Sequence, residues 1–153
     1  MEPSRTGPFP YVPINRRPRL EWPDGARIAI WVVPNFESFA LDQRMAGGDN
    51  VIPDVPHWAI RDYGARVGAF RLMDVISKRG IRATATVNAD VCDAYPQILE
   101  DAVALDWEFL GHNQTNITRL YQVPPEKEAG VIHDSLERVA VATGKRPTGW
   151  LGS

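Results

Sequence analysis

The sequence predicts an α/β fold in which parallel β-strands alternate with α-helices. Short runs that are typical of strands occupy residues 28–33, 81–87 and 107–110, and another begins at 148–152. The segments between these runs have apolar residues at the three-to-four-residue spacing of a helix. Strands that alternate with helices pair in parallel through right-handed crossovers.

The first strand is expected at "IAIWVV", residues 28–33, as a buried strand that Pro34 ends. A helix should follow from Arg61 and stop at Gly80. Its apolar positions are Tyr63, Val67, Phe70, Met73 and Ile76. The next segment, "IRATATV" at 81–87, alternates in the two-residue period of a strand.

The second half of the chain repeats this pattern. Pro96 suits the first turn of a helix, "WEFL" at 107–110 is a strand, and a helix opened by Pro125 ends at Gly144. "TGWLG" at 148–152 begins a fourth strand.

The alternation does not decide between an open sheet and a barrel. A complete barrel of this kind takes about 250 residues, so 153 residues supply about half of a distorted (β/α) barrel. A small open parallel sheet is the alternative. The unfinished last unit suggests a fragment, and its exposed sheet edges favour a homo-oligomer.

Two other segments stand apart from the alternating pattern. Residues 1–26 contain six prolines and are expected to form an extended arm, leaving residues 27–153 as the α/β domain. The long connection at 34–60 is interpreted as a partly packed lid that brings His57 or Trp58 near a substrate, with simple packing as the alternative.

The amino-acid composition indicates which kinds of partner and which cellular compartment to expect for the protein. A net charge of −2 gives no broad basic field for nucleic acid. Cys92 is the only cysteine, which rules out an intrachain disulfide, favours a reducing cytoplasm and is expected to be a buried thiol. The chain contains neither a membrane-length apolar run nor the apolar centre of a signal peptide at residues 1–20. The expected partner is a small-molecule substrate, without nucleic acid or membrane.

Polar residues follow each of the first three predicted strands. Ligands bind at the carboxyl ends of parallel strands, so these residues should share one rim. They are Asn35, Glu37, Ser38, Asn88, Asp90, His112, Asn113 and Asn116. A carboxylate and a histidine on one rim can move a proton and orient water. Taken alone, each of these residues is more often a helix cap or a turn residue than a catalytic one, and only for His112 are the two interpretations nearly balanced.

Four segments resemble, in order, the N-terminal half of the polysaccharide deacetylase (NodB-homology) family. They are "WPDGARIAIWVVPNFESF", "RDYGARVGAFRLMDVISKRGIRATATVNADV", "EFLGHNQTN" and "TGKRPTGWLGS". The resemblance runs from about Trp22 to the C-terminus and is strongest to the branch with metal-independent allantoinase and cyclic imide hydrolases. It implies a distorted (β/α) barrel and hydrolysis of carbon–nitrogen bonds other than peptide bonds.

The family's motifs imply a degenerate metal site. In the deacetylases, a Phe precedes an acidic base and an acidic metal ligand; aligned on Phe36, these positions hold Glu37 and Ser38. Two histidine ligands four residues apart fall on His112 and Asn116. A hydroxyl, an amide and one histidine would hold zinc poorly. No tightly bound cofactor is therefore expected, and weak binding of a divalent metal such as zinc at this site is the alternative.

The resemblance and the rim together predict an amidohydrolase. Glu37 would be the general base toward water, and His112 would donate a proton to the oxyanion or the leaving nitrogen. Substrate contacts are expected from Asn35, His57, Trp58, Asn88, Asn113 and Asn116. The substrate would be a small cyclic amide or ureide, or an N-acylated carbohydrate.

Two other classes of function compete with this prediction. One is a catalytically inactive, deacetylase-like binding or scaffold domain, because two metal-ligand positions are changed. The other, an unrelated open-sheet ligand-binding protein, is disfavoured because no glycine-rich phosphate loop follows the first predicted strand.

Overall fold

The computed structural model describes residues 7, 10–44 and 51–152 of the chain. It divides the chain into two compact units, Met1–Ile30 and Trp31–Ser153. In the first unit, the described residues form two single 3₁₀ turns, η1 (Ile14–Arg16) and η2 (Pro23–Gly25), and otherwise no regular structure. The prolines explain this, because each lacks the N–H that a longer helix would need.

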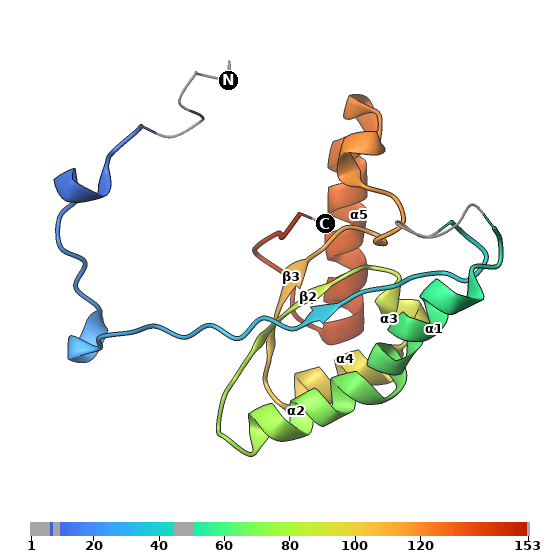
Figure 1. The fold of residues 1–153 in the computed structure, drawn as a ribbon, viewed down its shortest axis with the longest axis horizontal. Helices are drawn as coiled ribbons and strands as arrows, with labels where there is room; N and C mark the ends of the chain where they lie inside the picture. Colours follow the sequence, from blue (N-terminus) through green and yellow to red (C-terminus); the bar gives the residue numbers. More distant parts are fainter. Residues whose placement is uncertain (1–6, 8–9, 45–50, 153) are drawn as a thin grey trace. The chain divides into compact units, whose positions relative to one another are not determined.

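The second unit is built on a parallel sheet of three strands in the order β1-β2-β3 (Figure 1). The strands are β1 (Asn35–Phe36), β2 (Thr84–Val87) and β3 (Glu108–Gly111). Beyond β3, Trp150 forms a single parallel bridge to Gly111, where the fourth strand was expected to begin. The predicted α/β class with parallel strands is confirmed, and the sheet is open within the described residues.

The first strand lies later in the chain than its apolar run predicts. Residues 28–33 are not a buried strand: the Trp31 side chain is 67% exposed, and pairing with β2 runs from Val32 to Phe36. Pro34 does not end the strand, since its carbonyl accepts a hydrogen bond from the Thr86 N–H at 2.9 Å. Proline is tolerated here because β1 is an edge strand, and its missing N–H limits the regular part to two residues.

The connection from β1 to β2 contains more helix than the sequence predicts. Helix α1 (Val55–Tyr63) continues through a π-helical turn, η3 (Gly64–Gly68), into α2 (Ala69–Ser77). Asp54 caps α1 by accepting a hydrogen bond from the backbone N–H of His57 at 3.3 Å. His57 and Trp58 therefore lie in the first turns of a helix and not in the predicted lid connection.

The remaining helices agree with their sequence signals. Between β2 and β3 lie a short α3 (Val91–Ala94), which was not predicted, and α4 (Pro96–Ala104). After β3 come the 3₁₀ turn η4 (Leu120–Gln122) and α5 (Pro125–Thr143). Proline occupies the first turn of α4 and α5, and Gly144 ends α5 with φ = 69°.

The core lies between the sheet and a layer of helices. Helix α4 contacts α2 and α5, and α5 contacts β3. Strand residues Phe36, Ala85, Val87 and Phe109 and helix residues Met73, Ile76, Leu99 and Val139 form one buried cluster. The Phe36 ring stacks on Trp107 with centroids 6.2 Å apart. This packing fixes β1, and with it the side chain of Glu37, against the rest of the unit.

The helices of the described residues include none that combines the length and the apolar character needed to cross a membrane.

Candidate active site at the carboxyl ends of the strands

The exits of the three strands are joined by the side chain of Asn88. Its Oδ1 accepts a hydrogen bond from the Ser38 N–H at 2.9 Å, and its Nδ2 donates to the His112 carbonyl and to Asn116 Oδ1, the latter at 3.3 Å. Asn88 has 0% of its surface exposed. The amide of Asn88 is thus buried and holds the strand ends together, and its contact with substrate stays a prediction.

Glu37 and His112 face each other across the rim. His112 Nε2 lies 3.3 Å from Glu37 Oε1, and His112 Nδ1 lies 2.7 Å from the Leu151 carbonyl oxygen. A carbonyl oxygen only accepts hydrogen bonds, so Nδ1 must carry a proton. A neutral ring would then turn the Nε2 lone pair toward the carboxylate, so the geometry favours the doubly protonated imidazolium.

Hydrogen bonding shifts the two pKa values in opposite directions. The hydrogen bond from His112 lowers the pKa of Glu37 most strongly; burial opposes this, and a hydrogen bond from Asn116 adds to the lowering. Burial alone would lower the pKa of His112, but its bonds to Glu37 and to the Leu151 carbonyl outweigh burial and raise it. The pair therefore favours an ionised carboxylate beside an imidazolium.

The loop after His112 is fixed over the exit of β1. Thr115 Oγ1 and the Asn116 N–H both donate to the Ser38 carbonyl, at 3.2 and 3.4 Å. Asn113, in a left-handed conformation with φ = 70°, donates from Nδ2 to the Thr118 carbonyl at 2.7 Å. Asn113 is buried and shapes this loop, and its contact with substrate stays a prediction. The side chain of Asn116 reaches Glu37 and forms a hydrogen bond with its carboxylate.

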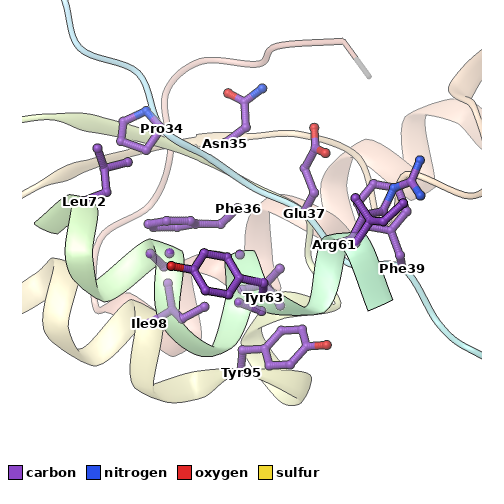
Figure 2. A pocket seen from close by; sticks show the side chains of 16 residues that line it. Pro34, Asn35, Phe36, Glu37, Phe39, Arg61, Tyr63, Leu72, Tyr95 and Ile98 are labelled. Atoms are coloured by element: carbon purple, nitrogen blue, oxygen red, sulfur yellow. The ribbon is translucent and has the colours of Figure 1, made fainter. Parts of the chain in front are cut away.

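A cavity of about 400 Å³ opens beside Glu37, between β1 and the α1–η3–α2 segment. Figure 2 shows Asn35 and Glu37 on one side of β1 and Phe36 on the other, inside the cavity. The aromatic residues in its wall are Phe36, Phe39, Tyr63 and Tyr95. An adjoining smaller pocket is lined by Glu37, Phe39, Trp58 and Arg61 together with Asp62, Ala65 and Tyr95.

Some of the other predicted site residues lie near Glu37 and others do not. Trp58 is brought to Glu37, whereas His57 lines neither pocket and instead bonds through Nδ1 to Asp54 Oδ1 at 3.0 Å. Asn35 lies on the rim and accepts a hydrogen bond from Thr86 Oγ1 at 2.8 Å. Asp90 pairs with Arg138 of α5 at 2.8 Å and thereby holds a helix.

Sequence reasoning missed Arg61 and Arg119. Arg61 shares both pockets with Glu37, and the charge of Arg119 contributes to lowering the pKa of Glu37. The only sequence signal for Arg61 was its place one helical turn after His57, which required knowing that α1 begins at Val55. Cys92, expected to be a buried thiol, is partly buried, and this burial raises its pKa to about 11.

The degenerate metal positions do not fit zinc. Both ring nitrogens of His112 are engaged within the chain, and Asn116 Oδ1 accepts a hydrogen bond from Asn88. Ser38 could add only a neutral hydroxyl, which does not offset the charge of the ion. Over the part of the chain that is described, no group of three His, Cys, Asp or Glu side chains is placed to hold a metal ion.

Neither family models nor curated proteins match this sequence. Solved structures do match. A probable polysaccharide deacetylase from Pseudomonas aeruginosa PAO1 superposes with a TM-score of 0.76 at 24% identity, over 89% of this chain and 50% of its own. PuuE allantoinase gives a TM-score of 0.75 at 21% identity, over 88% of this chain and 49% of its own.

A putative polysaccharide deacetylase from Mycobacterium smegmatis gives a TM-score of 0.63 at 19% identity, over 86% of this chain and 45% of its own. This chain thus spans about half the length of the solved structures it matches. The identities are low enough that the likeness concerns the fold. The chain has the fold of about half of a NodB-type (β/α) barrel, as found in polysaccharide deacetylases and in allantoinase.

Proposed function

We propose that this protein hydrolyses a carbon–nitrogen bond other than a peptide bond, in a small cyclic amide or ureide or in an N-acylated carbohydrate. The observation that carries the proposal is the Glu37–His112 pair, in which an ionised carboxylate and an imidazolium meet at the strand ends. The shared fold with a deacetylase and an allantoinase supports the same class of reaction.

The pair supplies a base and an acid for one hydrolysis. Water enters between substrate and Glu37, which removes a proton as the oxygen adds to the carbonyl carbon. His112 donates a hydrogen bond from Nε2 to the developing oxyanion and then gives its proton to the leaving nitrogen. The carbon–nitrogen bond breaks, leaving a carboxyl group and an amine or amide. Leu151 and Asn116 hold the two groups in place through their hydrogen bonds.

This site suits an activated carbonyl. The acid–base pair offers one proton donor toward the oxyanion, and the ligand positions do not fit a zinc ion that would polarise the carbonyl further. The nitrogen of a cyclic imide or ureide leaves more readily than that of an unstrained N-acetyl group. We therefore place cyclic amides and ureides before N-acylated carbohydrates.

A catalytically inactive binding or scaffold domain is the second candidate. It is favoured by the direct contact between Glu37 and His112, which satisfies each group with the other in the absence of substrate. At 3.3 Å this contact is long for a charged hydrogen bond, so a substrate oxygen or water can replace it.

Replacing Glu37 with Gln tests the function. Turnover of cyclic imides, allantoin and N-acetyl sugars is measured in the purified protein, and kcat should fall by about 100-fold or more for the substrate that is turned over. Glu108→Gln is the matched control, since Glu108 lies on β3 but is exposed and near Arg82, at 3.6 Å.

A metal chelator should leave turnover unchanged. Unchanged turnover in Glu37→Gln would contradict the role of Glu37 as general base. No turnover by the original protein of any of these compounds, or of their analogues that carry a carboxylate, would support the inactive binding domain instead.

A further inference from the structure

Arg61 presents a fixed cation to the cavity beside Glu37. Its Nη1 donates to the His57 carbonyl at 2.8 Å, and its guanidinium carbon lies 4.6 Å from the centroid of the Phe39 ring. Figure 2 shows Arg61 and Phe39 at the same end of the cavity as Glu37. Among the described residues Arg61 forms no salt bridge, so donors of its guanidinium fork are left for a ligand.

A second cation, Arg119, acts on the same site from the loop after β3. Its charge contributes to lowering the pKa of Glu37 and also acts on His112. The peptide group before Arg119 is held by two hydrogen bonds: Asn113 Nδ2 donates to the Thr118 carbonyl, and the Arg119 N–H donates to Gln122 Oε1 at 2.8 Å. Arg119 likewise has no carboxylate partner in the described part of the chain.

The charges around the cavity do not balance. Glu37 is matched by the His112 imidazolium, and Asp62, in the smaller pocket, is paired with Arg66 at 2.6 Å. Arg61, which lines the cavity with Glu37, and Arg119, whose charge acts on Glu37 and His112, remain as an excess of positive charge. A guanidinium that is stacked on a ring and held by a carbonyl is pre-organised to bind a carboxylate with two parallel hydrogen bonds.

We propose that the substrate carries a carboxylate, which Arg61 binds at the cavity while Arg119 adds longer-range attraction. This inference rests on the proposed hydrolysis at Glu37 and His112, and it names the chemical class of the substrate. Arg61 is a specificity residue in this scheme, since it holds the substrate without taking part in proton transfer. A neutral analogue of the same size would lose the charged hydrogen bonds.

Succinamate and its neutral isostere succinamide separate charge recognition from shape. Binding of each compound to the protein is measured by calorimetric or NMR titration at low ionic strength. Succinamate should bind about tenfold more tightly, the difference expected for one hydrogen bond to a charged group. Arg61→Gln should reduce that preference to within about twofold, while Arg61→Lys should keep part of it.

Arg79→Gln is the matched control, because Arg79 also donates to a carbonyl four residues earlier, at 2.9 Å, but on an exposed surface. It should leave the preference intact. Equal affinities for the two compounds, no detectable succinamate binding, or a preference that survives in Arg61→Gln would overturn the inference. These readouts need no turnover, so the hydrolysis proposed for Glu37 can stand or fail separately.

Discussion

At the scale of single residues, one buried amide organises the candidate site. Asn88 accepts from the first residue after Glu37 and donates to the carbonyl of His112, so it sets the separation of the two reacting side chains. Because Asn88 is fully buried, water could not replace its hydrogen bonds if the side chain were removed, and its partners would be left unpaired. Asn88 is thus a positioning residue for both Glu37 and His112.

Asn88→Ala should lower the free energy of unfolding by about 3 kcal/mol, because it orphans a buried N–H and a buried carbonyl. Urea unfolding followed by circular dichroism measures this loss. Asn35→Ala is the comparison, since Asn35 is exposed and has one side-chain bond, to Thr86; it should cost less than about 1 kcal/mol. Similar losses in both variants would contradict the role given to Asn88.

The Glu37–His112 pair predicts a window of pH in which it stabilises the fold. The lowered pKa of Glu37 gives stability that is present above the ordinary value of 4.5 and is lost as pH falls through the lower folded value. The raised pKa of His112 gives stability that is present below 6.5 and is lost as pH rises through the higher folded value. The two contributions coincide between these ordinary values.

The stability difference between the original protein and Glu37→Gln should therefore be greatest between about pH 4.5 and 6.5 and shrink on both sides. Thermal unfolding of both proteins across pH measures it. A difference that grows steadily above pH 6.5 would show that His112 is not the partner that titrates.

The residues of the pair could be found from sequence, because each follows a strand whose carboxyl end faces the rim. The protonation of His112 could not. It is set by the carbonyl of Leu151, which is 39 residues away along the chain and reaches the ring only through the bridge between Trp150 and Gly111. Likewise, burial of Asn88 and Asn113 depends on how the strand exits pack together, which no local pattern records.

At the scale of elements, β3 meets both the Trp150 segment and α5 at Gly111. A Cβ atom at this residue would lie 2.6 Å from the Trp150 ring and 2.8 Å from Leu136 Cδ2. Side chains cannot approach so closely, so the bridge to Trp150 requires glycine at this position. The same bridge delivers the Leu151 carbonyl to His112.

Gly111→Ala should destabilise the protein by about 2 kcal/mol, as overpacking of a core does. Gly130→Ala is the control, because Gly130 lies in α5 with no atom within 4 Å of an added Cβ and should gain up to about 1 kcal/mol from helix propensity. Chemical denaturation measures both. Equal effects of the two substitutions would contradict the close packing at Gly111.

The elements themselves were largely predictable, with the first strand as an exception. Helices α4 and α5 begin at prolines and α5 ends at a glycine, and these local signals act whatever the rest of the chain does. The run at 28–33 has the composition of a buried strand, but the chain pairs with β2 only from Val32 onward. Composition records a preference for extended backbone, whereas the pairing register is fixed by contacts with other strands.

At the scale of the whole molecule, the second unit exposes apolar surface next to an unpaired sheet edge. Strand β1 pairs with β2 alone among the described strands, and Ile60 on α1 and Val75 on α2 are 75% and 46% exposed. An open edge beside apolar side chains favours association with another chain. We accordingly propose that the 153-residue chain forms a homo-oligomer.

Sedimentation velocity should show a species larger than the monomer at micromolar concentrations. The double substitution Ile60→Glu and Val75→Glu should shift the chain toward the monomer, since charge on the contact surface opposes association. Val141→Glu is the control on α5, where Val141 is 85% exposed and distant in sequence from this surface. A monomer in the original protein would contradict the proposal.

The proline that precedes β1 has a consequence for how firmly the candidate base is held. Thr84, Thr86 and Asn88 donate their backbone N–H groups to the carbonyls of Val32, Pro34 and Phe36, but Pro34 has no N–H to return a bond. A fluctuation that frees β1 would expose these three amides together. Their protection from hydrogen exchange therefore reports the fraction of molecules in which β1 is paired and Glu37 lies within reach of His112.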